Sequence, residues 1–151
     1  MLANFAKVHL GGEKNMYRIA ICDDDLVFGS LLEQYLQNFA KTRRIPIDVL
    51  VFAQGEEYLE FLIEEFPVDL IFLDIQFEKG LDGVQIGKEL RADIKNEMTQ
   101  IIYISGIESY AMQLFQNRPM DFLVKPVKQE RVDHIMEEYL RLFGNRNKQY
   151  F

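Results

Sequence analysis

A short apolar segment that ends in a carboxylate constrains the fold of this chain more than any other feature. Val68 and residues 70–73 form the apolar run, Asp74 follows it directly, and a polar loop then extends to Asp82-Gly83. A run this short, rich in Ile and Leu, predicts a strand buried on both faces of a parallel sheet, because a helix needs more residues. Asp74 would then lie at the carboxyl end of a central strand, where open α/β sheets bind their ligands.

An alternation of apolar runs and amphipathic stretches continues from Tyr17 almost to the end of the chain. The apolar runs predict strands at 17–22, 47–52, 68–73, 99–104 and 121–124. Each is followed by a stretch with helical periodicity. Parallel neighbours need right-handed crossovers of about this length, so the sequence predicts an α/β fold, a doubly wound parallel sheet in a single domain.

Individual helices are marked by their apolar stripes and by residues that favour helix ends. Asp25 is the expected cap of the first helix, Gly55 opens the second, and Asp82 caps the third, in which Gly87 allows close approach to the sheet. Gly144 is expected to end the last helix. The stripes are Phe28, Leu31, Leu32, Tyr35, Leu36 and Phe39 in the first helix; Tyr58, Leu59, Leu62 and Phe66 in the second; Val84, Leu90 and Ile94 in the third; Tyr110, Leu114 and Phe115 in the fourth; and Val132, Ile135, Met136, Tyr139, Leu140 and Phe143 in the last.

Composition limits the classes of partner. The 24 acidic residues outnumber the 17 basic ones and leave a net charge of −7, which opposes nonspecific binding to nucleic acid. No apolar run approaches the roughly 18 residues of a membrane span, and no secretory signal is evident, so we expect a cytoplasmic protein without membrane contact. The single cysteine, Cys22, is expected to be a small buried hydrophobe. His9 and His134 are expected to be solvated.

Polar side chains follow four of the predicted strands. Asp23 and Asp24 come after the first strand, Asp74 after the third, Ser105 after the fourth and Lys125 after the fifth. Because the carboxyl ends of parallel strands share one edge of a sheet, we expect these groups to meet in one site. Three carboxylates crowded together repel one another, and a hard divalent cation relieves that repulsion. Mg²⁺ is the expected ion, with Mn²⁺ as a substitute on the same ligands.

A cation, an ammonium and a hydroxyl around a strand-end carboxylate favour phosphoryl transfer. That reaction requires positioning and neutralisation of charge on the transferred oxygens, which Mg²⁺, Lys125 and Ser105 could share. Asp74 would be the nucleophile and would form an aspartyl phosphate. Asp25 is interpreted as a helix cap because one residue suffices for that role.

The order of these residues along the chain resembles the receiver domain of two-component response regulators. The resemblance covers about residues 16–143 and rests on Asp23-Asp24, Asp74, Ser105 and Lys125-Pro126 at successive strand ends. It implies a flavodoxin-like (βα)5 fold with strand order 2-1-3-4-5, phosphorylated by a histidine kinase or a small-molecule phosphodonor. The segment from Ile104 to Leu123 is similar to receivers that precede LytTR-type DNA-binding domains.

The resemblance also implies a role for each residue of the site. Asp23, Asp24 and Asp74 would hold Mg²⁺ together with the backbone carbonyl of Gln76. Asp74 would be the phosphoacceptor. The remaining roles are Ser105 as phosphoryl contact and switch, Lys125 as ion pair of the phosphoryl group, a cis bond before Pro126, and Phe122 as switching aromatic. The chain departs from the family in the loop Ile75–Leu81, which is longer than usual and lacks a Met-Pro pair. Because of this difference in the loop, the resemblance does not imply a lifetime for the phosphoryl group on Asp74.

Residues outside the predicted domain, and the output of the domain, are open to several interpretations. Residues 1–15 are expected to be a leader or flexible extension, and residues 144–151 a tail or the start of a linker to an absent output domain that controls transcription. The receiver would then be a truncated or a stand-alone one. The face formed by helix four, strand five and helix five, with Tyr103, Tyr110 and Met120, is a candidate surface for homodimers.

Two other functions remain open from the sequence. One is a receiver-like interaction module that works without phosphorylation, which the altered loop favours and the full acidic set opposes. The other is a Mg²⁺-dependent phosphohydrolase with an aspartyl intermediate. Against that reaction, the chain has no second acid two residues after Asp74 and no cap domain to enclose a substrate. We therefore expect a phosphoryl acceptor with self-dephosphorylation rather than an enzyme acting on a separate substrate.

Overall fold

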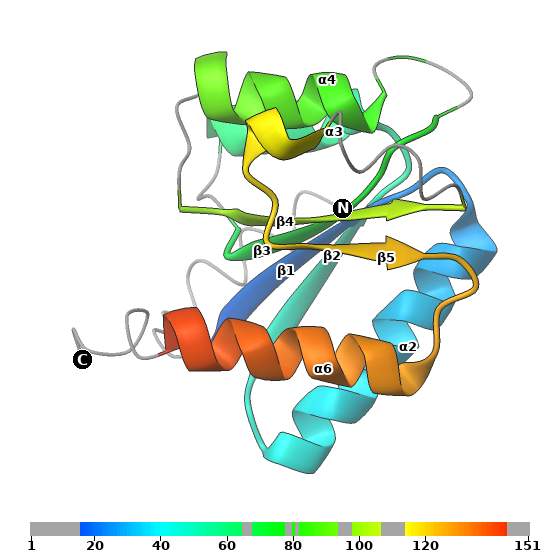
Figure 1. Ribbon diagram of the computed structural model, residues 1–151, viewed down its shortest axis with the longest axis vertical. Helices are drawn as coiled ribbons and strands as arrows, with labels where there is room; N and C mark the ends of the chain where they lie inside the picture. The colour runs from blue at the N-terminus through cyan, green and yellow to red at the C-terminus, as the bar shows by residue number, and fades with distance from the viewer. Residues whose placement is uncertain are drawn as a thin grey trace.

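The chain folds around a five-stranded sheet, shown in Figure 1 as a computed structural model. The structure describes residues 16–64, 68–77, 80, 82–93, 98–106 and 114–144. Each pair of neighbouring strands is parallel, and the order is β2-β1-β3-β4-β5, so the predicted topology is confirmed. The strands are β1 (Tyr17–Cys22), β2 (Ile47–Phe52), β3 (Leu70–Asp74), β4 (Gln100–Ser105) and β5 (Asp121–Val124).

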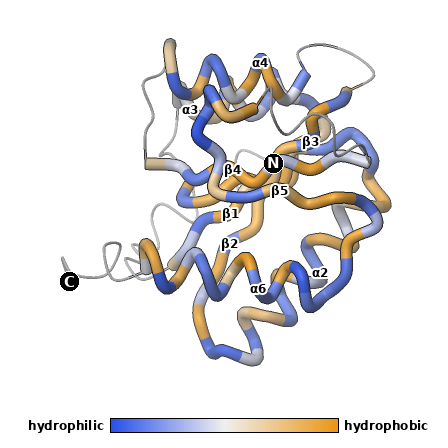
Figure 2. Tube along the Cα trace, in the orientation of Figure 1, coloured by the Kyte–Doolittle hydropathy of each residue, from blue (hydrophilic) through white to orange (hydrophobic). Residues whose placement is uncertain are grey.

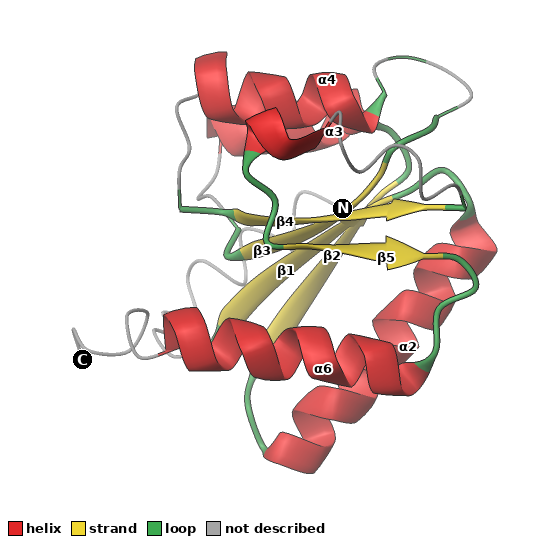
Figure 3. Cartoon of the chain, viewed as in Figure 1, coloured by secondary structure: helices red, strands yellow, loops and turns green. Residues whose placement is uncertain are grey.

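Helices cover both faces of this sheet (Figures 1 and 3). One face carries α2 (Leu26–Arg43) and α6 (Gln129–Tyr139), which continues as the π-helical turn η4 (Leu140–Gly144). The other carries α3 (Gly55–Glu64) and α4 (Gly83–Lys88), with the π-helical turn η1 (Glu89–Asp93) and the 3₁₀ turn η3 (Phe115–Asn117). The right-handed crossovers expected of parallel strands account for this division into three layers.

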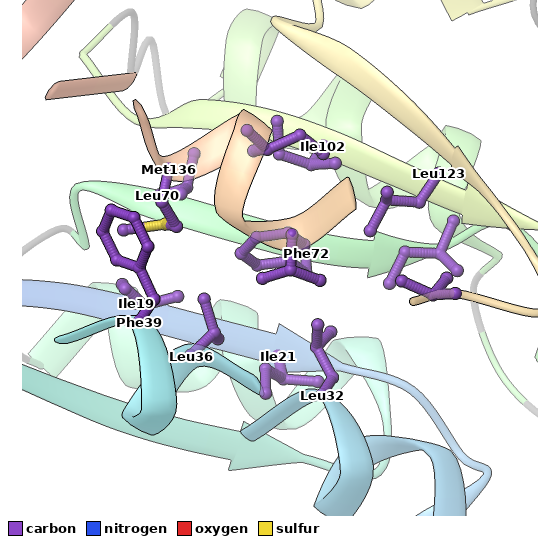
Figure 4. Packing of buried hydrophobic residues seen from close by; sticks show 14 of the residues in the cluster. Ile19, Ile21, Leu32, Leu36, Phe39, Leu70, Phe72, Ile102, Leu123 and Met136 are labelled. Atoms are coloured by element: carbon purple, nitrogen blue, oxygen red, sulfur yellow. The ribbon is translucent and has the colours of Figure 1, made fainter. Parts of the chain in front are cut away.

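The sheet separates two hydrophobic cores, because successive side chains of a strand point to opposite faces. Ile19 and Ile21 of β1 pack with α2 and α6, whereas Ala20 and Cys22 pack with α3 and α4. Figure 4 shows the first core from nearby, with Phe72 between the sheet and the helices, and Figure 2 shows the strands as the most apolar part of the chain. β3 is buried along its whole length, as its short apolar run predicted, whereas the outer strands β2 and β5 are only partly buried.

Two predicted strands differ in their bounds from those observed. The third was predicted at 68–73 and lies at Leu70–Asp74, and the fourth was predicted at 99–104 and lies at Gln100–Ser105. Neighbouring strands set these limits: Asp74 is aligned with Ile104 and Ser105 with Val124, so pairing includes the polar residue at each end. Strands β1, β2 and β5 have the predicted bounds.

The predicted helix ends are largely confirmed. Asp25 caps α2 by accepting the Phe28 N–H, and Asp82 caps α4 in a capping box with Gln85. A Cβ on Gly87 would lie 2.0 Å from the Tyr103 hydroxyl of β4, which explains the glycine at this close approach to the sheet. The Tyr17 hydroxyl lies 3.4 Å from the carbonyl oxygen of Gly144, so the first strand meets the end of the last helix.

Two stripe predictions were wrong. Leu31 is 42% exposed, because it lies to one side of the buried stripe formed by Phe28, Leu32, Leu36 and Phe39. Phe115 is 60% exposed in a 3₁₀ turn, whose three-residue repeat does not continue the predicted stripe. Phe66, Ile94 and Tyr110, the leader 1–15 and residues 145–151 lie outside the described residues, as does the side chain of Leu62. None of the described helices combines the length and apolar character needed to span a membrane.

Candidate functional site

Asp74 ends β3 at the carboxyl edge of the sheet, between β1 and β4. Its residue position is aligned with Ile104, and the next N–H along the chain, that of Ile75, donates to the Ile104 carbonyl at 3.0 Å. The Asp74 side chain is only 9% exposed. The Gln76 N–H donates to Asp74 Oδ1 at 3.3 Å, which orients the carboxylate from the loop side.

Asp23 and Asp24 lie beside Asp74, directly after β1. The Asp23 N–H donates to the Phe52 carbonyl of β2 at 3.0 Å, and Asp23 Oδ1 accepts the Asp25 N–H at 2.8 Å. Asp23 is fully buried, and Asp24 is more exposed. One carboxylate oxygen from each of Asp23, Asp24 and Asp74 lies within 4.8 Å of the others. The sequence predicted this cluster, and the structure brings its three members together.

Lys125 reaches the same cluster from the end of β5. Its Nζ lies 3.3 Å from Asp23 Oδ2 and 4.0 Å from Asp74 Oδ2. Its backbone N–H donates to the Ser105 carbonyl at 2.9 Å, so the ends of β4 and β5 are tied at this point. The peptide bond to Pro126 is cis, as the resemblance implied. The ammonium therefore partly neutralises the two buried carboxylates.

The other predicted residues surround this centre at different depths. Ser105 is the last residue of β4 and is buried, which puts it at the same edge as Asp74. Gln76 is exposed in the loop after Asp74. Phe122 is half-buried in β5 and stacks on Tyr103 of β4, with ring centroids 6.3 Å apart. The Tyr103 hydroxyl accepts a hydrogen bond of 2.8 Å from the Asn117 amide, so Tyr103 is part of the core and not of an exposed patch.

Burial and crowding perturb the proton affinity of Asp74. Burial raises the pKa of this carboxyl, the negative charge of Asp23 raises it further, and Lys125 and the Gln76 N–H oppose the rise. The resulting pKa of Asp74 is about 7, against a usual 3.8. Burial likewise raises the pKa of the Cys22 thiol, which is fully buried and therefore a core residue as predicted.

This donor set fits a hard divalent cation. Three carboxylates supply oxygen ligands. Burial, and after it the negative charge of Asp23, raises the pKa of Asp74, and a bound cation would favour the ionised carboxylate against both effects. The sulfur of Cys22 belongs to the core with Ala20 and Leu50, so no soft ligand competes among the described residues at this edge. Asp23, Asp24 and Asp74 therefore offer the oxygen ligands that suit Mg²⁺ or Mn²⁺.

The loop after Asp74 is closed by glycines. The Gly83 N–H donates to the Ile75 carbonyl at 2.8 Å, and a Cβ on Gly83 would lie 2.1 Å from the Asp74 carbonyl oxygen. Gly80 has a φ of 78° and lies against the Glu56 carboxylate of α3. Residues 78, 79 and 81 of the predicted long loop lie outside the described residues.

The sequence did not indicate one contact of the site. Phe28 was assigned only to the buried stripe of the first helix, but its ring centroid lies 4.4 Å from Lys125 Nζ. Phe28 and Lys125 are far apart in the sequence, so no local sequence pattern indicates that they are in contact. The arrangement as a whole combines a carboxylate nucleophile, an ammonium and oxygen ligands for a cation.

Comparison with known proteins identifies the kind of chain that carries this arrangement. The family model described as "Response regulator receiver domain" matches residues 19–137. A sensory transduction protein LytT from Oceanobacillus iheyensis is 33% identical over 79 residues, which are 52% of this chain and 32% of that protein. The LytT of Bacillus subtilis is 24% identical over 127 residues, covering 84% of this chain and 49% of the relative.

Solved structures show the same fold. The response regulator protein TrrA from Thermotoga maritima, solved in complex with Mg²⁺ and BeF, has a TM-score of 0.68 and 24% identity. The likeness covers 82% of this chain and 98% of that one. The chain thus matches nearly all of that solved domain, but spans half or less of the two LytT proteins.

Proposed function

This chain belongs to the response regulator receiver domain family of two-component systems, and from that premise we propose that it is a phosphoacceptor domain phosphorylated on Asp74. The observation that carries the proposal is the meeting of Asp23, Asp24 and Asp74 within 4.8 Å, with the Lys125 ammonium beside them. Receiver domains act as signalling domains, and their partners are histidine kinases or small-molecule phosphodonors.

In the proposed reaction a carboxylate oxygen of Asp74 attacks the phosphorus of the donor. The new O–P bond forms as the donor's bond breaks, P–N for a phosphohistidine or P–O for an acyl phosphate, and the leaving group keeps the electron pair. Asp74 must be ionised to attack, and Lys125 favours that ionised form. Asp23, Asp24, Asp74 and the Gln76 carbonyl would hold Mg²⁺, which supplies positive charge to the transferred phosphoryl oxygens.

We further propose that the phosphoryl group acts through Ser105 and Phe122. Ser105 ends β4, at the same end of the sheet as Asp74, and Phe122 lies in the adjacent strand β5. The Phe122 ring stacks on Tyr103 of β4. Added negative charge would bias two preexisting states of the face that the sequence assigns to the helix predicted after β4, to β5 and to α6. That face is also the proposed homodimer surface. Regulation of transcription would require an output domain of the LytTR type, as the resemblance to LytT proteins suggests.

The phosphorylation site can be tested with acetyl phosphate as donor. In the presence of Mg²⁺ we expect intact-mass spectrometry to detect one added phosphoryl group on the wild-type chain and none on Asp74→Asn. The matched control is Asp69→Asn: Asp69 precedes the same strand at the opposite sheet edge, and its carboxylate accepts the Arg18 N–H at 2.8 Å. Asp69→Asn should be phosphorylated like the wild type.

Three results would contradict the proposal. Phosphorylation of Asp74→Asn at the wild-type rate would show that another residue is the acceptor. Absence of saturable Mg²⁺ binding, followed by tyrosine fluorescence of the wild type, would favour the interaction module that works without phosphorylation. Multiple turnovers on a phosphate ester would instead favour the phosphohydrolase.

A further inference from the structure

We propose that Phe28 is a positioning residue for Lys125, holding the lysine ammonium against its ring face at the phosphoacceptor site. Lys125 Nζ lies 4.4 Å from the Phe28 ring centroid, a distance suited to a cation–π interaction. The same nitrogen faces Asp23 and Asp74, so the ammonium is bracketed by two carboxylates and one aromatic ring. The inference rests on the proposed function for its consequence, but not for the contact itself.

Phe28 is held where it lies by its own helix. Its N–H donates to Asp25 Oδ1 at 3.1 Å in the first turn of α2, and the residue is 9% exposed. The helix and its cap restrain the Phe28 backbone, and burial restricts the space open to the ring. Lys125 in contrast has a flexible four-carbon stem with a side chain 27% exposed. A restrained ring therefore restricts a mobile cation.

The ring differs from the two carboxylates in what happens to it when the site is used. Lys125 Nζ is closer to Asp23 than to the acceptor Asp74, by the distances of 3.3 and 4.0 Å. Both carboxylates belong to the set that would hold the divalent cation, and Asp74 would also form the new bond to phosphorus. Phe28 has no part in either event. Its attraction for the ammonium thus persists when the carboxylates are engaged, and keeps Lys125 near the incoming phosphoryl group.

A core role alone would make a different prediction for Phe28. Leucine fills much of the same apolar space but has no π face, so Phe28→Leu separates packing from attraction of the cation. Phe28→Tyr keeps the ring. Phe39→Leu is the matched control, because Phe39 lies in the same buried stripe of α2 and is 5% exposed, at the far end of the helix.

The contact is tested first by NMR of the metal-free protein, with the Lys125 side chain assigned by Lys125→Arg. We expect the ring current of Phe28 to displace the Lys125 Hε resonance upfield. The displacement should disappear in Phe28→Leu and persist in Phe28→Tyr and Phe39→Leu. A Lys125 resonance that is undisplaced in the wild type, or unchanged in Phe28→Leu, would overturn the proposal whether or not the chain is ever phosphorylated.

The consequence is tested by the rate of phosphorylation by acetyl phosphate at saturating Mg²⁺. We expect Phe28→Leu to be slower than Phe39→Leu by about three- to tenfold, the range that a partly desolvated cation–π contact supports. Phe28→Tyr should keep the wild-type rate. Equal rates for the two leucine variants, or equal losses for both Phe28 variants, would refute positioning. A wild type with the displaced resonance but no phosphorylation would instead refute the proposed function and leave the contact established.

Discussion

The proton on Asp74 decides whether this carboxyl adds a negative charge to the acidic cluster. Burial and the neighbouring Asp23 raise its pKa to about 7, although Lys125 and the Gln76 N–H oppose them. The folded protein therefore binds this proton more tightly than the unfolded chain, in which the pKa is near 3.8. The stability that this tighter binding contributes is complete below the unfolded pKa and is lost as the pH rises through about 7.

Asp74→Asn should accordingly stabilise the metal-free protein at alkaline pH. The amide cannot ionise, so it avoids both the cost of burying a charge and the repulsion with Asp23. We expect a gain on the order of 2 kcal/mol at pH about 8 that vanishes toward pH about 4. Urea unfolding in EDTA across this range measures it. A gain independent of pH would contradict the assignment. Added Mg²⁺ should reduce the difference, because the wild type gains more from a bound cation.

The convergence of the strand-end residues was predictable from the sequence, but their contacts with side chains of the helices were not. Asp23, Asp74, Ser105 and Lys125 could be expected to meet, because the topology of a parallel sheet brings the carboxyl ends of its strands to one edge. Their functional roles remain predictions. The Phe28 ring against Lys125 depends instead on how far α2 lies from the end of β5, and no sequence period encodes that distance.

Among the secondary-structure elements, α4 is the one whose packing most directly limits the acceptor strand. It begins at Gly83, whose hypothetical Cβ would be 2.1 Å from the Asp74 carbonyl oxygen, and passes Tyr103 at Gly87. A side chain at either glycine would therefore require the neighbouring atoms to move. The capping box of Asp82 and Gln85 fixes the start of this helix, so α4 cannot simply slide away.

Gly83→Ala should therefore disturb both stability and the site. Because the obstacle is backbone and not a flexible side chain, we expect a loss of about 2 kcal/mol or more in the free energy of unfolding. Weaker Mg²⁺ binding should accompany it. Gly29→Ala in α2 is the control: its Cβ would meet only Val51 at 3.8 Å, and alanine favours a helix by up to about 1 kcal/mol. Urea unfolding of both variants checks the prediction, and equal stabilities would contradict it.

Element bounds were predictable where a strand's own sequence defines them. β1 and β5 end just before a charged residue, β2 begins just after Pro46, and all three strands lie where predicted. β3 and β4 are shifted toward the carboxyl end, because pairing with their neighbours extends through Asp74 and Ser105. The burial of Phe115 was not predictable, because an apolar residue in a short turn can be either buried or exposed, and Phe115 is exposed.

The sheet couples the two hydrophobic cores into one cooperative unit. Ile19 and Ile21 of β1 belong to one core, and Ala20 and Cys22 of the same strand belong to the other, so both cores depend on the position of β1. Tyr139 reports on the first core and Tyr58 on the second, and the chain has no tryptophan.

Unfolding should therefore be a single transition. We expect tyrosine fluorescence and far-ultraviolet circular dichroism to give the same urea midpoint. Leu36→Ala in one core and Ile86→Ala in the other should each lower the stability by about 2–5 kcal/mol while the two signals remain coincident. Separate midpoints in either variant would show that the cores unfold independently.

The hydrogen bond between Tyr17 and Gly144 has a practical consequence for joining this domain to other polypeptides. It brings the start of β1 and the end of η4 together at the amino ends of the strands, on the edge of the sheet away from Asp74 (Figure 1). An affinity tag, a fluorescent protein or an effector fused at either point begins on that side. The point of attachment of such a fusion does not obstruct the acidic site. A structural change at Asp74 has to cross the length of the sheet to reach an effector fused there.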